Sequence, residues 1–173
     1  MTLLMAEIMK LFRRLGAALA FIFMTACASA QLNWQSLKAQ IRNQFPSVEH
    51  ITTTDFKENY SGSALVVDVR NADEFAVSHI PDAVHFQDAD QLAAWIKRQP
   101  TQPVVVYCSV GYRSAQMAKS LQKLGLQQVV NLEGSIFEWA NQGEPVVAPT
   151  GPTQKVHPFN EKWGQLLEEK YHP

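Results

Sequence analysis

The stretch PVVVYCSVGYRSAQMAKSLQKLG, residues 103–125, joins an apolar run to a helical pattern through a short polar loop. The run at 103–107 is short and rich in valine, which predicts a strand buried on both faces. Residues 113–124 have the spacing of a helix that ends at Gly125. A buried strand that turns directly into a helix is typical of a parallel α/β sheet, so this stretch indicates the fold class.

The same alternation runs through the middle of the chain. Further strands are predicted at 63–69, 83–86 and 128–134, and helices at 71–80, 88–99 and 135–143. An extended piece at 50–56 leads into a helical turn, with Thr53 or Thr54 as its cap. Pro81 is expected to end the helix that precedes it. This order predicts a central parallel sheet with helices on both faces.

Four segments are expected along the chain. Residues 1–30 read as an export signal, 31–49 as an N-terminal helical extension, 50–148 as the α/β domain, and 149–173 as a linker followed by a docking helix. The linker is predicted from the Pro, Gly and Thr residues at 148–153. The amphipathic stretch from Asn160 to Tyr171 carries three apolar residues expected to dock on the domain: Trp163, Leu166 and Leu167.

The signal prediction rests on three features in order. KLFRR at 10–14 is basic, LGAALAFIFMTA at 15–26 is apolar, and ASAQ at 28–31 offers a small-x-small cleavage site. The chain is therefore expected to be exported, to the periplasm. The sequence MTAC at 24–27 partly matches a bacterial lipobox, so lipidation at Cys27 stays open as an alternative.

Composition sets further bounds. The chain has 173 residues with a formal net charge of -1, enough for one domain with a proper core. The balanced charge gives no reason to expect nucleic acid or an anionic membrane as a partner, and a monomer is expected. His157 and His172 have no close spacing or carboxylate cluster around them, so we expect surface histidines, no metal and no cofactor.

Cys108 lies where the carboxyl end of a strand meets the next helix, the place where parallel sheets gather ligands. Gly111 permits a backbone conformation that other residues rarely adopt. A loop turned in this way can point its amides inward, and these amides together with the N-terminus of the next helix favour the binding of an anion. Arg113 adds a full charge, while Ser109 and Ser114 add hydroxyl donors. These features predict a thiol that ionises near neutral pH and acts as a nucleophile. The alternative is a buried structural cysteine.

Three segments together resemble a single rhodanese domain. They are VVDVRNADEFAVSHIPDAVHF, CSVGYRS and VVNLEGSIFEWANQGEPVV, which span about residues 50 to 147 in the order and spacing of that family. The resemblance implies a parallel five-stranded sheet. It also implies sulfurtransferase chemistry, in which a cysteine persulfide carries sulfur from a donor such as thiosulfate to a thiol or cyanide.

The resemblance also implies roles for individual residues. Cys108 would be the nucleophile, Arg113 would attract an anionic donor, and the backbone of the loop residues would cradle the persulfide: Ser109, Val110, Gly111, Tyr112 and Arg113. Asp68 and Arg70 match a carboxylate and an arginine beside the end of the sheet. Glu74 is expected to pair with Arg70, and we expect these three residues to be structural supports.

The chain departs from the family pattern at Ser78 and Ser135, where the family usually has glycine. Both positions are expected to lie away from the cysteine and to affect only local turns. Tyr112 is bulky for the rim of such a loop and is expected either to narrow access or to stack on a donor.

Three other functions share some of these features. A cysteine-dependent phosphatase of the same fold has one more residue between its cysteine and arginine, because phosphate needs more room than one sulfur atom. The loop from Cys108 to Arg113 lacks that residue, which argues against a phosphatase. A non-catalytic sulfur carrier or partner-binding module, with the tail as the contact to a protein partner, stays open. A thiol sensor needs an external thiol, because no resolving cysteine lies near Cys108.

Overall fold

The computed structural model describes residues 32–99 and 101–173. The predicted export signal and Cys27 lie outside the described residues. Within the described part of the chain, no helix is both long and apolar enough to span a membrane. The strands of the main sheet are β1 (Glu49–Ile51), β2 (Leu65–Asp68), β3 (Val84–His85), β4 (Val104–Tyr107) and β5 (Val129–Leu132). The α-helices are α2 (Trp34–Gln44), α3 (Thr53–Asn59), α4 (Ala72–Val77), α5 (Ala89–Ile96), α6 (Tyr112–Lys123), α7 (Ser135–Asn141) and α8 (Glu161–Gly164).

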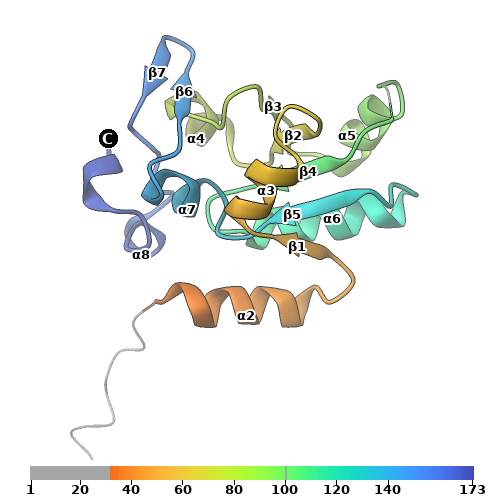
Figure 1. Cartoon of the computed structure of the whole chain (residues 1–173), viewed down its shortest axis with the longest axis horizontal. Helices are drawn as coiled ribbons and strands as arrows, with labels where there is room; N and C mark the ends of the chain where they lie inside the picture. Colours follow the sequence, from red (N-terminus) through yellow and green to blue (C-terminus); the bar gives the residue numbers. More distant parts are fainter. Residues whose placement is uncertain (1–31, 100) are drawn as a thin grey trace, which may run out of the picture. The chain divides into compact units, whose positions relative to one another are not determined.

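The central sheet has five parallel strands in the order β1-β5-β4-β2-β3 (Figure 1). Every residue of β4 and of β5 is buried, as expected for strands covered on both faces. Figure 1 shows α3 and α7 on one side of the sheet and α6 on the other. The predicted α/β fold with a parallel five-stranded sheet is therefore confirmed.

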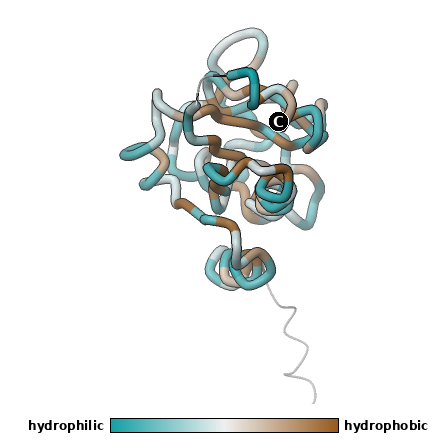
Figure 2. Tube along the Cα trace, turned by 90° about the vertical axis from the view of Figure 1, so that its right-hand side faces the viewer, coloured by the Kyte–Doolittle hydropathy of each residue, from teal (hydrophilic) through white to brown (hydrophobic). Residues whose placement is uncertain are grey.

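Hydropathy explains this layering. Figure 2 shows hydrophobic strands enclosed by segments of mixed hydropathy. The helix α6 covers β4 and β5 with a buried face made of Ala115, Ala118 and Leu121. Small side chains on this face let the helix approach the sheet closely. The valines of β4 fill the space on both sides of the strand, so burial of apolar surface is the main force holding this unit together.

The first two helices of the domain begin and end where local hydrogen bonds set them. The cap of α3 is Thr52, not Thr53 or Thr54: its hydroxyl accepts from the amide of Asp55, whose carboxylate accepts from the amide of Thr52. The helix α4 ends at Val77, before Pro81 is reached. At its C-cap, Ser78 is already extended, so the proline is not what ends this helix.

The region after the domain differs from the expected linker. Strands β6 (Val146–Ala148) and β7 (Gly151–Thr153) form an antiparallel hairpin, and Val147 also bridges to His79. The linker prediction was wrong here because the extended backbone of a Pro-containing segment finds hydrogen-bond partners on a neighbouring strand.

The tail docks on the domain, as predicted, although its helix is short. Leu166 and Leu167 are both buried, and the side-chain amide of Asn141 donates to the carbonyl of Leu166 (2.8 Å). The predicted amphipathic helix is divided into α8 and a 3₁₀ turn, η1 (Glu169–Tyr171). His157 and His172 are partly buried and make local contacts with the backbone, Nδ1 of His157 by accepting from the amide of Phe159.

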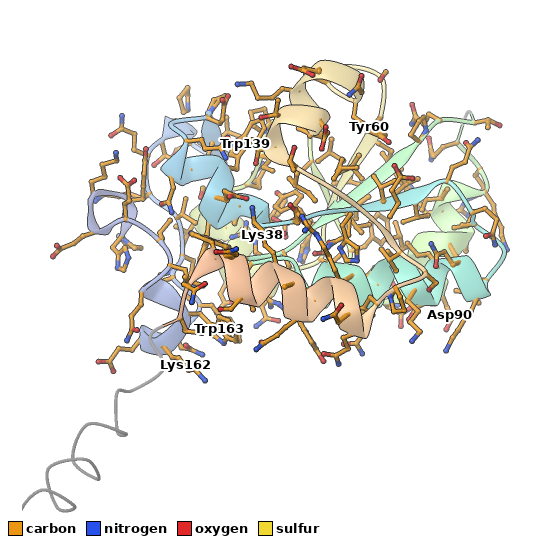
Figure 3. All side chains as sticks on the ribbon, turned by 60° about the horizontal axis from the view of Figure 1, so that its bottom comes forward. Lys38, Tyr60, Asp90, Trp139, Lys162 and Trp163 are labelled. Carbon is orange, nitrogen blue, oxygen red and sulfur yellow. The ribbon has the colours of Figure 1, made fainter. Side chains whose placement is uncertain are left out.

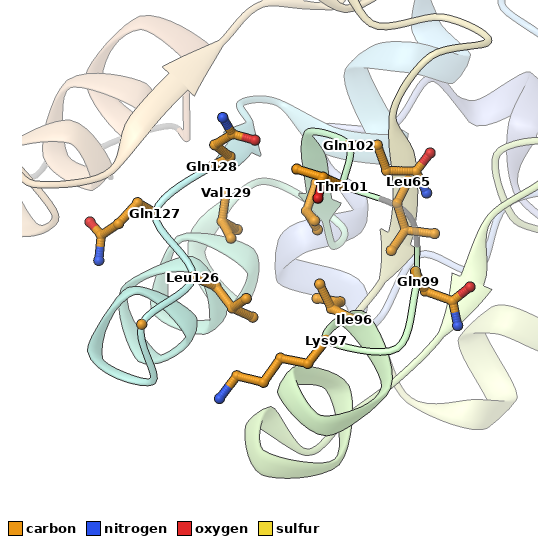
Figure 4. A pocket seen from close by; sticks show the side chains of 12 residues that line it. Leu65, Ile96, Lys97, Gln99, Thr101, Gln102, Leu126, Gln127, Gln128 and Val129 are labelled. Carbon is orange, nitrogen blue, oxygen red and sulfur yellow. The ribbon is translucent and has the colours of Figure 1, made fainter.

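A cavity of about 220 Å³ lies at the amino ends of β2, β4 and β5 (Figure 4). Leu65, Val104 and Val129, the first residues of these strands, contribute to its lining together with Lys97 and several glutamines. No cysteine, histidine or carboxylate is among its described lining residues. It therefore offers no nucleophile, and it lies at the end of the sheet opposite to the one where parallel sheets usually bind ligands.

Candidate active site

Cys108 is the first residue after β4, and α6 begins four residues later at Tyr112. Gly111 has a φ of 105°, a conformation that favours glycine, and it turns the chain back toward the cysteine. As a result, the amide of Gly111 donates to Sγ of Cys108 at 3.1 Å. The amino end of α6, where unpaired amides and the helix dipole favour negative charge, starts at the same point. The amide of Gly111 thus points to the sulfur, whereas a cradle formed by the other loop amides stays a prediction.

The Cys108 side chain is almost fully buried, but it borders a cavity. Cys108 is 1% exposed, and its residue lines a cavity of about 340 Å³ at the carboxyl end of the sheet. Burial alone raises the pKa of this thiol, but the charge of Arg113 and donors on Ser114 and Gly111 outweigh it and lower the pKa below the ordinary value. The sulfur therefore borders a cavity in surroundings that favour its anion, and its role as a nucleophile stays a prediction.

Glu74 pairs with Arg113, which corrects the expected pair with Arg70. The two nitrogens of Arg113 donate to the two oxygens of Glu74 at 2.7 and 2.8 Å, and Ser109 Oγ donates to the same carboxylate at 2.8 Å. Glu74 lies in the first turn of α4 and accepts the amide of Asn71, so its carboxylate is directed to the cysteine loop. Burial raises the pKa of Glu74, but these donors, led by Arg113, lower it overall.

Arg70 instead folds back on Asp68, two residues earlier. Its guanidinium makes hydrogen bonds of 2.7 to 3.0 Å to that carboxylate and also donates to the carbonyl of Ser78. Both side chains of this pair are fully buried. Asp68 pairs in the sheet with Tyr107, the residue that precedes Cys108. The buried pair of Asp68 and Arg70 therefore supports the strand end that carries the cysteine.

Ser135 contacts the cysteine, contrary to the expectation that it lies away from it. Its hydroxyl accepts from the amide of Cys108 (3.0 Å) and donates to the carbonyl of Leu132 (2.8 Å). The residue has a φ of 50°, which is uncommon outside glycine, and it starts the turn into α7. The amide of Ile136 then donates to the carbonyl of Cys108. Ser135 therefore fixes the backbone of the nucleophile.

Asn131 is a second residue that the sequence reasoning missed. Its side-chain amide donates to the carbonyl of Gly111 at 3.1 Å from within the buried strand β5. The signal for it was the single polar side chain in the apolar strand VVNL at 129–132, because a buried polar group needs a partner. The resulting bond holds the turn that carries the Gly111 amide.

The remaining predicted loop residues have different surroundings. Ser114 is fully buried and Val110 is nearly so, whereas Tyr112 is 38% exposed. The ring of Tyr112 packs edge-on against Phe45, and its hydroxyl accepts from Gln44 of α2. Tyr112 therefore forms part of the cavity wall. Whether it narrows access or stacks on a donor stays a prediction.

We call the residues that surround the sulfur the floor: Cys108, Ser109, Gly111, Arg113, Ser114, Glu74, Asn131 and Ser135. They offer one sulfur atom, donors that stabilise its anion, and an arginine paired to a glutamate. Among the described residues, no group of three His, Cys, Asp or Glu side chains is placed to hold a metal ion.

Comparisons with known proteins agree with this geometry. The family model described as Rhodanese-like domain matches residues 52–142. A sulfurtransferase of Allochromatium vinosum is 38% identical over 87 residues, which cover 50% of this chain and 81% of that protein. The chain spans between 31% and 54% of the length of several other curated relatives.

Two solved structures are also similar. The crystal structure of a rhodanese-related protein from Thermoplasma volcanium has 30% identity and a TM-score of 0.50, covering 57% of this chain and 97% of that one. The solution structure of a polysulfide-sulfur transferase homodimer from Wolinella succinogenes has 24% identity and a TM-score of 0.52, covering 67% and 90%; this second likeness concerns the fold alone. Because the family match spans more than half of the chain and contains the cysteine loop, the protein belongs to the rhodanese-like domain family.

Proposed function

We propose that the protein is a sulfurtransferase that carries a sulfane sulfur as a persulfide on Cys108. The observation that supports it most strongly is the surroundings of Sγ: an inward amide at 3.1 Å, the charge of Arg113 and a cavity above. A thiolate held in this way attacks sulfur readily. The loop of six positions from Cys108 to Arg113 fits a single added sulfur better than a phosphoryl group.

Each step of the transfer is a displacement at sulfur with no net redox change. The Cys108 thiolate attacks the outer sulfur of thiosulfate, a new S–S bond forms, and the old S–S bond breaks with its electron pair leaving on sulfite. A cyanide ion or an acceptor thiolate then attacks the outer sulfur of the persulfide. The S–S bond to Cys108 breaks, and the enzyme thiolate is restored.

The floor residues have three roles in this transfer: stabilising the anion, holding the backbone and supplying a positive charge. The Gly111 amide and the amino end of α6 stabilise the anion in both the thiolate and the persulfide state. Ser135 and Asn131 hold the backbone on either side, so that the loop does not have to reorganise during transfer. Arg113, fixed by Glu74, adds a stationary positive charge close to the reacting sulfur.

The test is steady-state transfer of sulfur from thiosulfate to cyanide by wild type, Cys108→Ser and Cys27→Ser. We expect Cys108→Ser to abolish thiocyanate formation and Cys27→Ser, the same change at the other cysteine, to keep it. Thermal unfolding verifies that both variants fold. Activity that survives Cys108→Ser would refute the proposal, whereas a stable persulfide without turnover would favour a sulfur-carrier role.

A further inference from the structure

The cavity above Cys108 has apolar walls that come from three separate parts of the chain. We call these side chains the walls: Leu37 and Ile41 from α2, Val110 and Tyr112 from the loop, Phe159 and Trp163 from the tail. Figure 3 shows Trp163 on α8 beside the amino end of α2. At about 340 Å³, the cavity is large enough for a small organic molecule and much larger than one added sulfur requires.

Two of the wall residues are large hydrophobic side chains that stay exposed. In the described part of the chain, Tyr112 and Phe159 are the two such residues, each 38% exposed, and both line this cavity. Phe159 has a φ of 65°, and its amide donates to Nδ1 of His157 at 3.0 Å. Non-glycine residues in this conformation are strained and are concentrated at functional sites. The structure therefore maintains this ring above the cysteine at some cost in stability.

Charge in the cavity is already compensated. Arg113 is the one charged residue among the described lining residues. Its guanidinium donates two hydrogen bonds to the carboxylate of Glu74. The ring of Phe159 covers it from another side, with 4.7 Å between the guanidinium carbon and the ring centroid. A small inorganic anion would have to compete with Glu74 for this cation, whereas an apolar group would bury surface against the walls.

The walls from α2 and the tail lie outside residues 52–142, the part that the family model matches. The docked tail and the ion pairs of α2 with α7 and the end of β5 hold them in place: Lys38 with Glu138, and Arg42 with Glu133. The selectivity that they impose is thus a property of this chain's own extensions.

We infer that the donor served by this site is the persulfide of a thiol with an apolar body, such as an aryl or branched alkyl group. This inference rests on the proposed sulfur transfer. The Cys108 thiolate attacks the outer sulfur of R–S–S⁻, the S–S bond of the donor breaks, and R–S⁻ leaves with the electron pair. Charge and atoms balance, because one thiolate and one persulfide anion are consumed and one of each is formed. The walls hold R while the floor holds the transferred sulfur.

The test uses two stable donors with the same reactive group, benzenethiosulfonate and methanethiosulfonate, with cyanide as the acceptor. For wild type we expect kcat/KM to favour the aryl donor by about tenfold or more, the effect of burying a ring in an apolar site. Phe159→Ala and Trp163→Ala should each reduce this preference at least about threefold. Phe159 is partly exposed, so its variant keeps the test valid if Trp163→Ala unfolds the tail.

Trp95→Ala is the matched control. Trp95, on α5, is also a partly buried tryptophan, but it packs against Phe86 and does not line the cavity. This variant should keep the aryl preference of wild type. Equal use of both donors by wild type, or a preference that the wall variants leave intact, would overturn the inference while leaving sulfur transfer in place.

A second readout does not depend on transfer. Benzenesulfonate and methanesulfonate carry no sulfane sulfur, so they can only occupy the cavity, and their protection of Cys108 against alkylation by iodoacetamide can be measured. We expect benzenesulfonate to protect at about tenfold lower concentration than methanesulfonate in wild type and Trp95→Ala, and this advantage to shrink in Phe159→Ala. If transfer fails but aryl protection holds, the proposed function is wrong and the apolar cavity stands; equal protection contradicts the apolar site.

Discussion

The floor and the walls of the Cys108 cavity differ in chemistry and in origin. The floor is polar and is built by hydrogen bonds and ion pairs within the family domain, whereas the walls are apolar and come mostly from α2 and the tail. The floor residues are Cys108, Ser109, Gly111, Arg113, Ser114, Glu74, Asn131 and Ser135. The comparison teaches that reactivity and selectivity are supplied by different segments, so each should be changeable without the other.

The largest effect on stability is expected at the buried pair of Asp68 and Arg70. Asp68→Asn removes the charge that compensates Arg70 in a fully buried pair, and leaving such a charge unpaired costs about 3–5 kcal/mol. Urea unfolding, followed by tryptophan fluorescence, measures this. Asp90→Asn, an exposed carboxylate in the first turn of α5, should change stability by less than about 0.5 kcal/mol. Similar costs for the two variants would mean that the floor does not depend on buried charge.

The next effect separates reactivity from structure. Arg113→Met removes the largest influence that lowers the pKa of Cys108, so alkylation by iodoacetamide at neutral pH should slow about tenfold. Lys123→Met, an exposed lysine at the far end of the same helix, should leave the rate within about twofold. An unchanged rate in Arg113→Met would remove Arg113 from the account of the floor.

A pH dependence follows from the lowered pKa of Cys108. Because the unfolded thiol, with an ordinary pKa of about 8.5, binds its proton more tightly than the folded one, stability gained from this group rises with pH up to that value. Wild type should therefore gain melting temperature relative to Cys108→Ser between about pH 6 and about pH 8.5. A gap that narrows over this interval would show that the floor disfavours the thiolate.

The smallest effect is expected in the walls. Phe159→Gly removes the contact with Arg113 but also relieves the strain of a positive φ, so stability should change by less than about 1 kcal/mol. Urea unfolding checks this against the loss expected for Asp68→Asn. A loss of several kcal/mol would show that the tail aromatic is part of the structural core and not a separable wall.

The sequence predicted the floor better than the walls, for physical reasons. The run PVVVY and the loop CSVGYRS are contiguous, so strand burial, the Gly111 turn and the reactive thiol follow from local rules. The predicted partner of Glu74 was wrong because Arg70 is close in sequence, whereas Arg113 is 39 residues away and reaches Glu74 only in the folded protein. Ser135 was missed because its hydroxyl acts through a turn 27 residues away from the cysteine.

The walls depend on contacts that no local pattern encodes. Leu37, Cys108 and Phe159 come from the two ends and the middle of the chain and meet only in the folded protein. Docking of the tail was predicted from its apolar residues, but its target and the hairpin at β6 and β7 were not. The division of the chain into segments 31–49, 50–148 and 149–173 stays a prediction.

The most direct test of the central claim, that the floor holds Cys108 ready to carry one sulfur atom, is mass spectrometry of the peptide that contains Cys108. The protein is analysed before and after incubation with benzenethiosulfonate, and again after addition of cyanide. The account predicts that this peptide gains the mass of one sulfur atom and loses it to the acceptor, while Cys108→Ser gains nothing. Sulfur found on another peptide, or no gain at all in a folded protein, would contradict it.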